Sequence, residues 1–191
     1  MTLKQIVRIE AVKLKRPANI ILLSLVLLIY IGLVASNFYD FSIEESGDIN
    51  AVLFKGLLQI EGGFIGFFIA IFIIMNIGKE YSDGTFKKNI IDGYTRSQFY
   101  TGKILILILT VLLISIFGKA VLLIGSLLIG HFADAIRFFT APVLINSLLK
   151  IITAGIFALF LSFLTSNLTI SLLLYLLWGA MESLVSQLSA D

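Results

Sequence analysis

The sequence predicts an all-α protein that crosses a membrane several times, and three observations support this fold class. First, 59% of the 191 residues are hydrophobic and only 14% are charged, whereas a typical soluble domain is about half apolar and a quarter charged. Second, the mean hydropathy is +1.04. Third, the apolar residues form runs of about 20 residues, the length that a helix needs to cross roughly 30 Å of hydrocarbon. A water-soluble protein of this size could not bury all of these runs.

Residues 1–16 combine apolar side chains at helical spacing with long basic side chains. This pattern is typical of an amphipathic helix that lies in the headgroup region of a membrane. The alternative is an unstructured basic leader that only fixes the topology. The apolar run that follows has no small-x-small cleavage site, so we do not expect a cleavable signal peptide.

Five membrane-spanning helices are predicted after this interfacial helix. Pro17 suits the first turn of the first span, and the tight turn Thr165-Ser166-Asn167 separates the last two spans. The predicted spans cover about residues 18–36, 62–78, 104–130, 142–164 and 168–182. We predict a single transmembrane domain over residues 1–191.

The basic residues predict how the spans are oriented. Lysine and arginine cluster before the first span and in residues 79–103, whereas residues 37–50 contain four acidic residues and no basic one. Because basic loops stay on the cytoplasmic side, the N-terminus and residues 79–103 are expected in the cytoplasm. The net charge of +2 gives no argument for binding nucleic acid.

The charged segment between the second and third spans contains signals for two helices. Thr85 can cap a short helix over residues 86–92, and Gly93 can end it. Thr95 and Gln98 have the spacing of a capping box, which predicts that the next helix begins there and continues into the third span.

The short helix is too apolar for a free loop, because it carries Phe86, Ile90 and Ile91. Such side chains pack on the membrane surface or in a groove of another protein. The alternative is that residues 79–103 form only a basic loop that follows the positive-inside rule.

This segment also resembles a known family. Permease subunits of type-2 ABC exporters carry the pattern Glu-Tyr-x-x-Gly-Thr … Arg … Lys, which is matched here by residues 80–85, Arg96 and Lys103. Arg8-x-Glu10, before the first span, fits the same family. The resemblance implies an exporter pathway in the bacterial plasma membrane. Its implied partners are cytoplasmic ABC ATPase subunits, a second permease copy or homologue, and membrane lipid.

The resemblance assigns a partner-binding role to the charged segment. Residues 86–92 would be the coupling helix that docks into a groove of the ATPase, and the residues before it would shape the turn. The expected partner-binding residues are Glu80, Tyr81, Gly84, Thr85, Phe86, Lys87, Ile90, Ile91 and Arg96.

Two features depart from the family pattern. Gly93-Tyr94 stands where many relatives have a proline, which leaves the exit of the coupling helix open. The family has six spans and only five are predicted here, so we expect a shortened relative or a truncated permease. A non-transport membrane scaffold or immunity-type protein is the alternative function.

The sequence predicts no catalysis and no cofactor in this chain. A Gly-x-x-x-x-Gly-Lys-Ser/Thr phosphate-binding loop is missing, because Gly102-Lys103 is followed by Ile104 and Ser97 stands where the earlier glycine is required. The sequence has no cysteine and one histidine, so we predict no metal site. ATP and Mg²⁺ would be bound, and ATP hydrolysed, only by the partner ATPase.

Four ionisable residues lie within the predicted spans or, for Glu61, at the outer end of the second span, all at similar depth in the outer leaflet. They are Glu61, Lys119, Lys150 and Glu182. Charges in hydrocarbon are costly, which makes these residues candidates for a function. Our hypothesis is a layer of ion pairs between helices beside the export route. The alternative is that each side chain separately reaches toward the headgroups.

Overall fold

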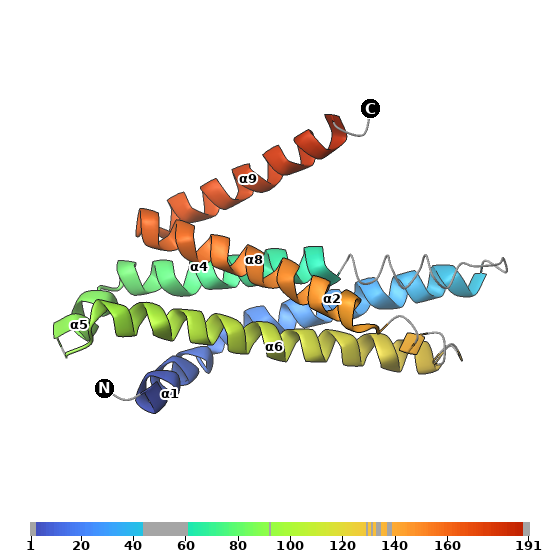
Figure 1. Cartoon of the computed structure of the whole chain (residues 1–191), viewed down its shortest axis with the longest axis horizontal. Helices are drawn as coiled ribbons and strands as arrows, with labels where there is room; N and C mark the ends of the chain where they lie inside the picture. Colours follow the sequence, from blue (N-terminus) through green and yellow to red (C-terminus); the bar gives the residue numbers. More distant parts are fainter. Residues whose placement is uncertain are drawn as a thin grey trace.

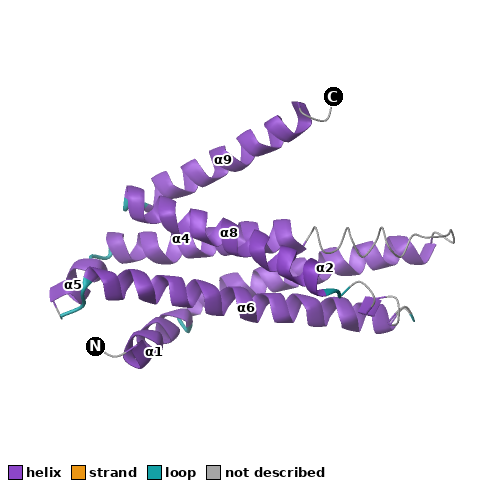
Figure 2. Ribbon diagram, viewed as in Figure 1, coloured by secondary structure: helices purple, strands orange, loops and turns teal. Residues whose placement is uncertain are grey.

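The computed structural model describes residues 3–43, 61–91, 93–128, 130, 132, 135–136 and 139–188. These residues form helices joined by short turns, and no strand occurs among them (Figure 2). In chain order the elements are α1 (Leu3–Leu14), α2 (Pro17–Ile43), the π-helical turn η1 (Glu61–Ile65), α4 (Gly66–Ser82), α5 (Thr85–Ile91), α6 (Arg96–Leu128), α8 (Ala141–Thr165) and α9 (Leu168–Leu188). The all-α prediction is confirmed.

Five of the described helices are long and apolar enough to cross a membrane. They are α2, α4 together with most of η1, α6, α8 and α9, and their apolar stretches overlap the five predicted spans. The longest, α6, has 33 residues, so it extends about 50 Å, well beyond the roughly 30 Å of the hydrocarbon. Its polar first turns, from Arg96 to Lys103, account for part of this excess.

The helices α2, α4, α6 and α8 lie side by side, and the most extensive contact is between α4 and α8 (Figure 1). The chain reverses at Ser166, which has a left-handed φ of 49°, and α9 then diverges from the bundle (Figure 1). At the opposite end of the chain, α1 lies against the start of α6. As a result α1, α5 and the α8–α9 turn share one end of the bundle, and α9 ends toward the other (Figure 1).

Close packing holds the bundle together. Its fully buried side chains include Tyr30, Phe72 and Leu107. Small residues let α4 approach α8, since a Cβ built on Gly66 would lie 3.5 Å from the Cβ of Ala154. Because lipid tails are as apolar as leucine, van der Waals contact at such small residues, rather than hydrophobic burial, drives association between helices in a membrane.

Some predicted features lie outside the described residues. Residues 44–50 belong to the acidic segment, Asp92 was the expected last residue of the short helix, and Glu61 is described without its side chain.

Candidate functional site at the α1 and α5 end

A tight turn links α4 to α5. The N–H groups of Asp83 and Gly84 donate to the carbonyl oxygens of Lys79 at 2.8 Å and Tyr81 at 3.2 Å. Gly84 has a φ of +66°, in the left-handed region that glycine adopts without steric cost. Because α5 already begins at Thr85, this residue lies in its first turn and does not cap it as predicted.

The end of α5 has the hydrogen bonds of a Schellman motif. The N–H of Gly93 donates to the carbonyl of Ile90 at 3.1 Å, and the N–H of Tyr94 donates to the carbonyl of Asn89 at 2.9 Å. Gly93 has a φ of +93°, as this motif requires at the position after the helix. The predicted helix end at Gly93 is confirmed, and glycine itself supplies the exit geometry.

The predicted capping box opens α6. The N–H of Thr95 donates to Oε1 of Gln98 at 3.1 Å, and the N–H of Gln98 donates to Oγ1 of Thr95 at 3.2 Å. These reciprocal bonds satisfy two N–H groups that have no partner within the helix.

The inner face of α5 packs against its own chain. The Phe86 ring centroid lies 5.0 Å from that of Tyr81 in α4 and 4.8 Å from that of Phe99 in α6. Ile90 packs against the same small core, in which Phe99 is fully buried. Two of the three apolar residues expected to meet a partner therefore anchor α5 within the molecule.

The outer face of α5 is open. Lys87 and Lys88 are exposed, and 84% of Ile91 is exposed. Arg96, at the start of α6, is exposed as well. These residues, rather than Phe86, form the surface that another protein can reach.

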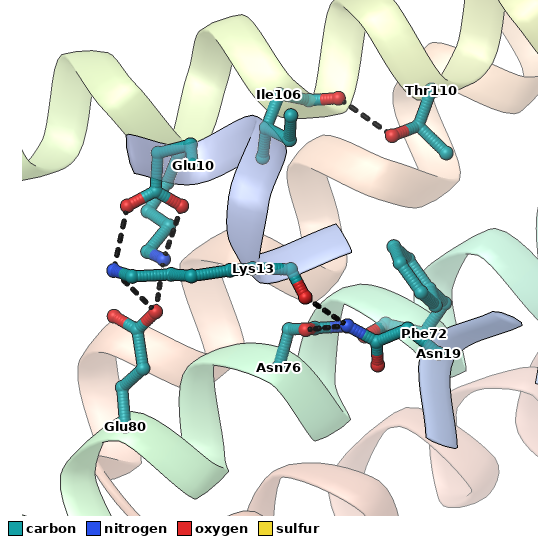
Figure 3. A network of polar contacts seen from close by, with 9 residues as sticks. Glu10, Lys13, Asn19, Phe72, Asn76, Glu80, Ile106 and Thr110 are labelled. Atoms are coloured by element: carbon teal, nitrogen blue, oxygen red, sulfur yellow. Dashed lines mark hydrogen bonds and ion pairs between the residues drawn. The ribbon is translucent and has the colours of Figure 1, made fainter. Parts of the chain in front are cut away.

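Four charged side chains meet where α1, α4 and α6 come together, and we call them the charge cluster (Figure 3). Lys103 Nζ, from α6, lies 2.7 Å from Oε2 of Glu10 in α1 and 2.6 Å from Oε1 of Glu80 in α4. Lys13 Nζ, also from α1, lies 2.9 Å from Oε1 of Glu10 and 2.9 Å from Oε1 of Glu80. No more than 14% of any of these side chains is exposed. Each charge therefore has two opposite neighbours in a nearly dry site.

The two charges that α1 contributes are stabilised in their ionised forms. Burial raises the pKa of Glu10, but the ammonium groups of Lys103 and Lys13 outweigh it and hold this pKa below its ordinary value. Burial lowers the pKa of Lys13, but the carboxylates of Glu10 and Glu80 outweigh it and raise this pKa. Removing one member of such a buried group leaves an uncompensated charge, which is strongly destabilising.

Gly102 lets α1 lie close enough to α6 for this cluster to form. A Cβ at this position would lie 2.9 Å from Cγ2 of Ile6 and 3.5 Å from Cγ of Glu10. Ile6 is only 3% exposed and has little room to move. The missing side chain of Gly102 therefore brings Glu10 within reach of Lys103.

Amide side chains extend the polar contacts to α2. The Nδ2 group of Asn19 donates to the carbonyl of Lys13 and to Oδ1 of Asn76, both at 2.9 Å. Asn76 in turn donates to the carbonyl of Phe72 at 2.8 Å (Figure 3). The start of α2 is thereby joined to α1 and α4.

Glu80, Glu10 and Lys103 were each part of a predicted family motif, but their meeting was not predicted. A signal was available. Glu10 lies four residues after Ile6 on one face of α1, and Lys103 lies four residues after Phe99 on one face of α6. A charge on the buried face of a helix requires a buried partner of opposite sign.

Two lysines lie within 2.6–2.9 Å of the two carboxylates of the charge cluster. Across the described residues, no three His, Cys, Asp or Glu side chains gather in a way that could hold a metal ion.

Comparison with known proteins identifies the family. The model of the ABC-2 family transporter protein matches residues 6–182. The chain belongs to the ABC-2 transporter family. It is therefore a multi-pass membrane transport component with a permease role, of a kind that in general works with an ABC ATPase. No curated protein and no solved structure matches the chain.

The charges within the spans of this permease differ in their surroundings. Lys119 in α6 donates to Oγ of Ser147 in α8 at 3.1 Å. Lys150 in α8 and Glu182 in α9 line a groove between α4, α8 and α9. Within the described part of the chain, neither of these two forms an ion pair. With the Glu61 side chain outside the described residues, the ion-pair layer stays a hypothesis.

Proposed function

We propose that this permease forms the membrane pathway of an ATP-driven exporter in the bacterial plasma membrane, and that a separate ATPase subunit drives it through α5. One observation carries the proposal. The inner face of α5 is fastened to α4 and α6 by Phe86, while Lys87, Lys88 and Ile91 on its outer face are exposed. An isoleucine exposed at a helix end, beside two lysines, suits a groove with an apolar floor and an acidic rim.

The charge distribution supports a cytoplasmic position for α5. The α1 and α5 end of the bundle carries the exposed basic side chains Arg8, Lys15, Lys79, Lys87, Lys88 and Arg96. By the positive-inside rule this end faces the cytoplasm, where the ATPase would bind ATP and Mg²⁺. The N-terminus is then cytoplasmic as well.

A continuous set of contacts supports transmission of movement from α5 into the membrane. Phe86 packs on Phe99, and Lys103 Nζ lies 5.2 Å from the centroid of the Phe99 ring. Lys103 then binds Glu10 and Glu80 in the charge cluster. Because breaking a buried pair costs several kcal/mol, about 3–5, a force on α5 would move α1, α4 and α6 together.

The proposed assembly contains a second permease copy or a homologue. Among the described side chains of α9, Ser171 alone is buried. A membrane helix with so few contacts in its own chain leaves a long face for another subunit.

The test is co-purification of the detergent-solubilised chain with a co-expressed ABC ATPase subunit from the same genome. Ile91→Asp is expected to weaken binding about tenfold or more, since it puts a charge into an apolar contact. Leu128→Asp is the matched control, because Leu128 is 82% exposed but lies at the far end of α6. Phe86→Asp would instead disturb the anchoring of α5. A loss of ATPase binding in this variant would therefore not distinguish a lost contact from a misplaced helix.

Undiminished ATPase binding by Ile91→Asp combined with Lys87→Glu and Lys88→Glu would rule out α5 as the contact. Binding by the wild type without any stimulation of ATP hydrolysis would argue for a non-transport scaffold.

A further inference from the structure

An open groove of about 790 Å³ lies between α4, α8 and α9, away from α5. Sites for small molecules commonly have volumes of about 300–1,000 Å³. Aromatic side chains form its walls, with ring centroids of Phe157 lying 5.3 Å from Trp178 and 6.2 Å from Tyr175. Phe67 lies 6.0 Å from Tyr175 and extends the aromatic surface to α4. The groove is therefore suited to a molecule with a substantial apolar part.

Two opposite charges also face this groove, Lys150 from α8 and Glu182 from α9. The stem of Lys150 lies over Gly62, with its Cδ 3.2 Å from where a Cβ would be. Both residues are exposed, and neither forms an ion pair within the described part of the chain. Unpaired charges at membrane depth are costly. The groove thus presents a cation and an anion for which the described residues supply no partner.

The depth of these charges corresponds to one leaflet. Lys150 lies nine residues after the start of α8 at Ala141, or about 13 Å along the helix. Glu182 lies six residues before the end of α9 at Leu188, or about 9 Å. Both side chains can therefore reach the headgroup boundary of the leaflet opposite α5.

We propose that the groove is a binding site for a zwitterionic phospholipid with a primary ammonium, of the phosphatidylethanolamine type. Its phosphate accepts hydrogen bonds from Lys150 and its ammonium donates to Glu182, so both charges are neutralised by charge-assisted bonds. The ammonium can also lie against the ring of Trp178. An anionic lipid satisfies Lys150 alone, and a quaternary ammonium has no proton to donate to Glu182.

The bilayer itself is the source of this ligand. Several apolar side chains that line the groove are open to the outside, with Leu149 55% exposed, Trp178 56% exposed and Phe67 38% exposed. A lipid can therefore enter sideways from the leaflet. This binding is independent of ATP-driven export.

The experiment is native mass spectrometry of the purified full chain, equilibrated with equal mole fractions of phosphatidylethanolamine and phosphatidylglycerol. The wild type is expected to retain phosphatidylethanolamine roughly five- to tenfold better. Glu182→Gln is expected to reduce that ratio to about one, and Lys150→Gln to weaken retention of both lipids. Lys119→Gln is the matched control, because Lys119 binds Ser147 and does not line the groove. Gel filtration verifies that each variant is folded.

Equal retention of the two lipids by the wild type would overturn the proposal, as would an unchanged ratio in Glu182→Gln. A ratio that falls equally in Lys119→Gln would place the effect outside the groove. Release of the bound lipid on adding the ATPase and ATP would identify it as cargo and contradict a resident lipid.

Discussion

The two ends of this permease treat charge in opposite ways. At the α1 and α5 end, four charges form ion pairs with one another at 2.6–2.9 Å and are almost completely buried. At the other end, Lys150 and Glu182 face an open groove and are exposed. A charge in an apolar helix therefore has no single structural role. Charges that meet across helices hold the bundle together, whereas charges that face a shared cavity leave room for a ligand.

The largest expected difference is between Lys103→Met and Lys150→Met. Lys103→Met leaves Glu10 and Glu80 sharing only Lys13, and should lower the free energy of unfolding by about 3–5 kcal/mol. Lys150→Met should change it by about 0.5 kcal/mol or less. Unfolding of both variants in mixed micelles, followed by tryptophan fluorescence, measures this. Equal losses of unfolding free energy in the two variants would contradict the proposed difference between the two ends.

A smaller difference is expected between Gly102→Ala and Gly62→Ala. The added methyl at Gly102 would lie 2.9 Å from the buried Ile6, and overpacking of this kind costs about 1–3 kcal/mol. At Gly62 it would lie 3.2 Å from Cδ of Lys150. The side chain of Lys150 is flexible and borders an open groove, so it can move away from the added methyl. We therefore expect a lower unfolding midpoint only for Gly102→Ala. A matching loss in Gly62→Ala would mean that Lys150 is held as firmly as the charge cluster.

The smallest effect is a dependence on pH at the charge cluster. Because the pKa of Glu10 is lowered by folding, its contribution is present above the unfolded pKa of about 4.3 and is lost as the pH falls through the lower folded value. Because the pKa of Lys13 is raised, its contribution is complete below about pH 10.4 and is lost as the pH rises through the folded value. The stability difference between wild type and Glu10→Gln should therefore be constant from about pH 5 to 9 and shrink in stronger acid. A difference that grows in acid would contradict this assignment.

Much of the fold was predictable because its signals are local. The capping box of Thr95 and Gln98 and the helix end at Gly93 each depend on residues a few positions apart. The apolar runs likewise predicted the five described helices that are long and apolar enough to cross a membrane.

The charge cluster was harder to predict because its contacts are distant. Lys103 and Glu10 are separated by 93 positions, and they meet only because Gly102 admits α1 to the surface of α6. The orientation of α5 could not be predicted from the local sequence either. A helix of 7 residues is too short for its pattern to distinguish an inward Phe86 from an outward Ile91, so tertiary packing decides which residues a partner can touch.

The length of α6 has a mechanical consequence. This helix runs without interruption from Arg96 to Leu128 and contains no proline, so it can act as a stiff lever. It contacts α2 in its second half, where the hydroxyl of Tyr30 donates to the carbonyl of Gly118 at 3.5 Å. A tilt of about 5° around the centre of a helix about 50 Å long displaces each end by about 2 Å. A small displacement imposed on α6 at Phe99 therefore moves the other end of this helix in the opposite direction.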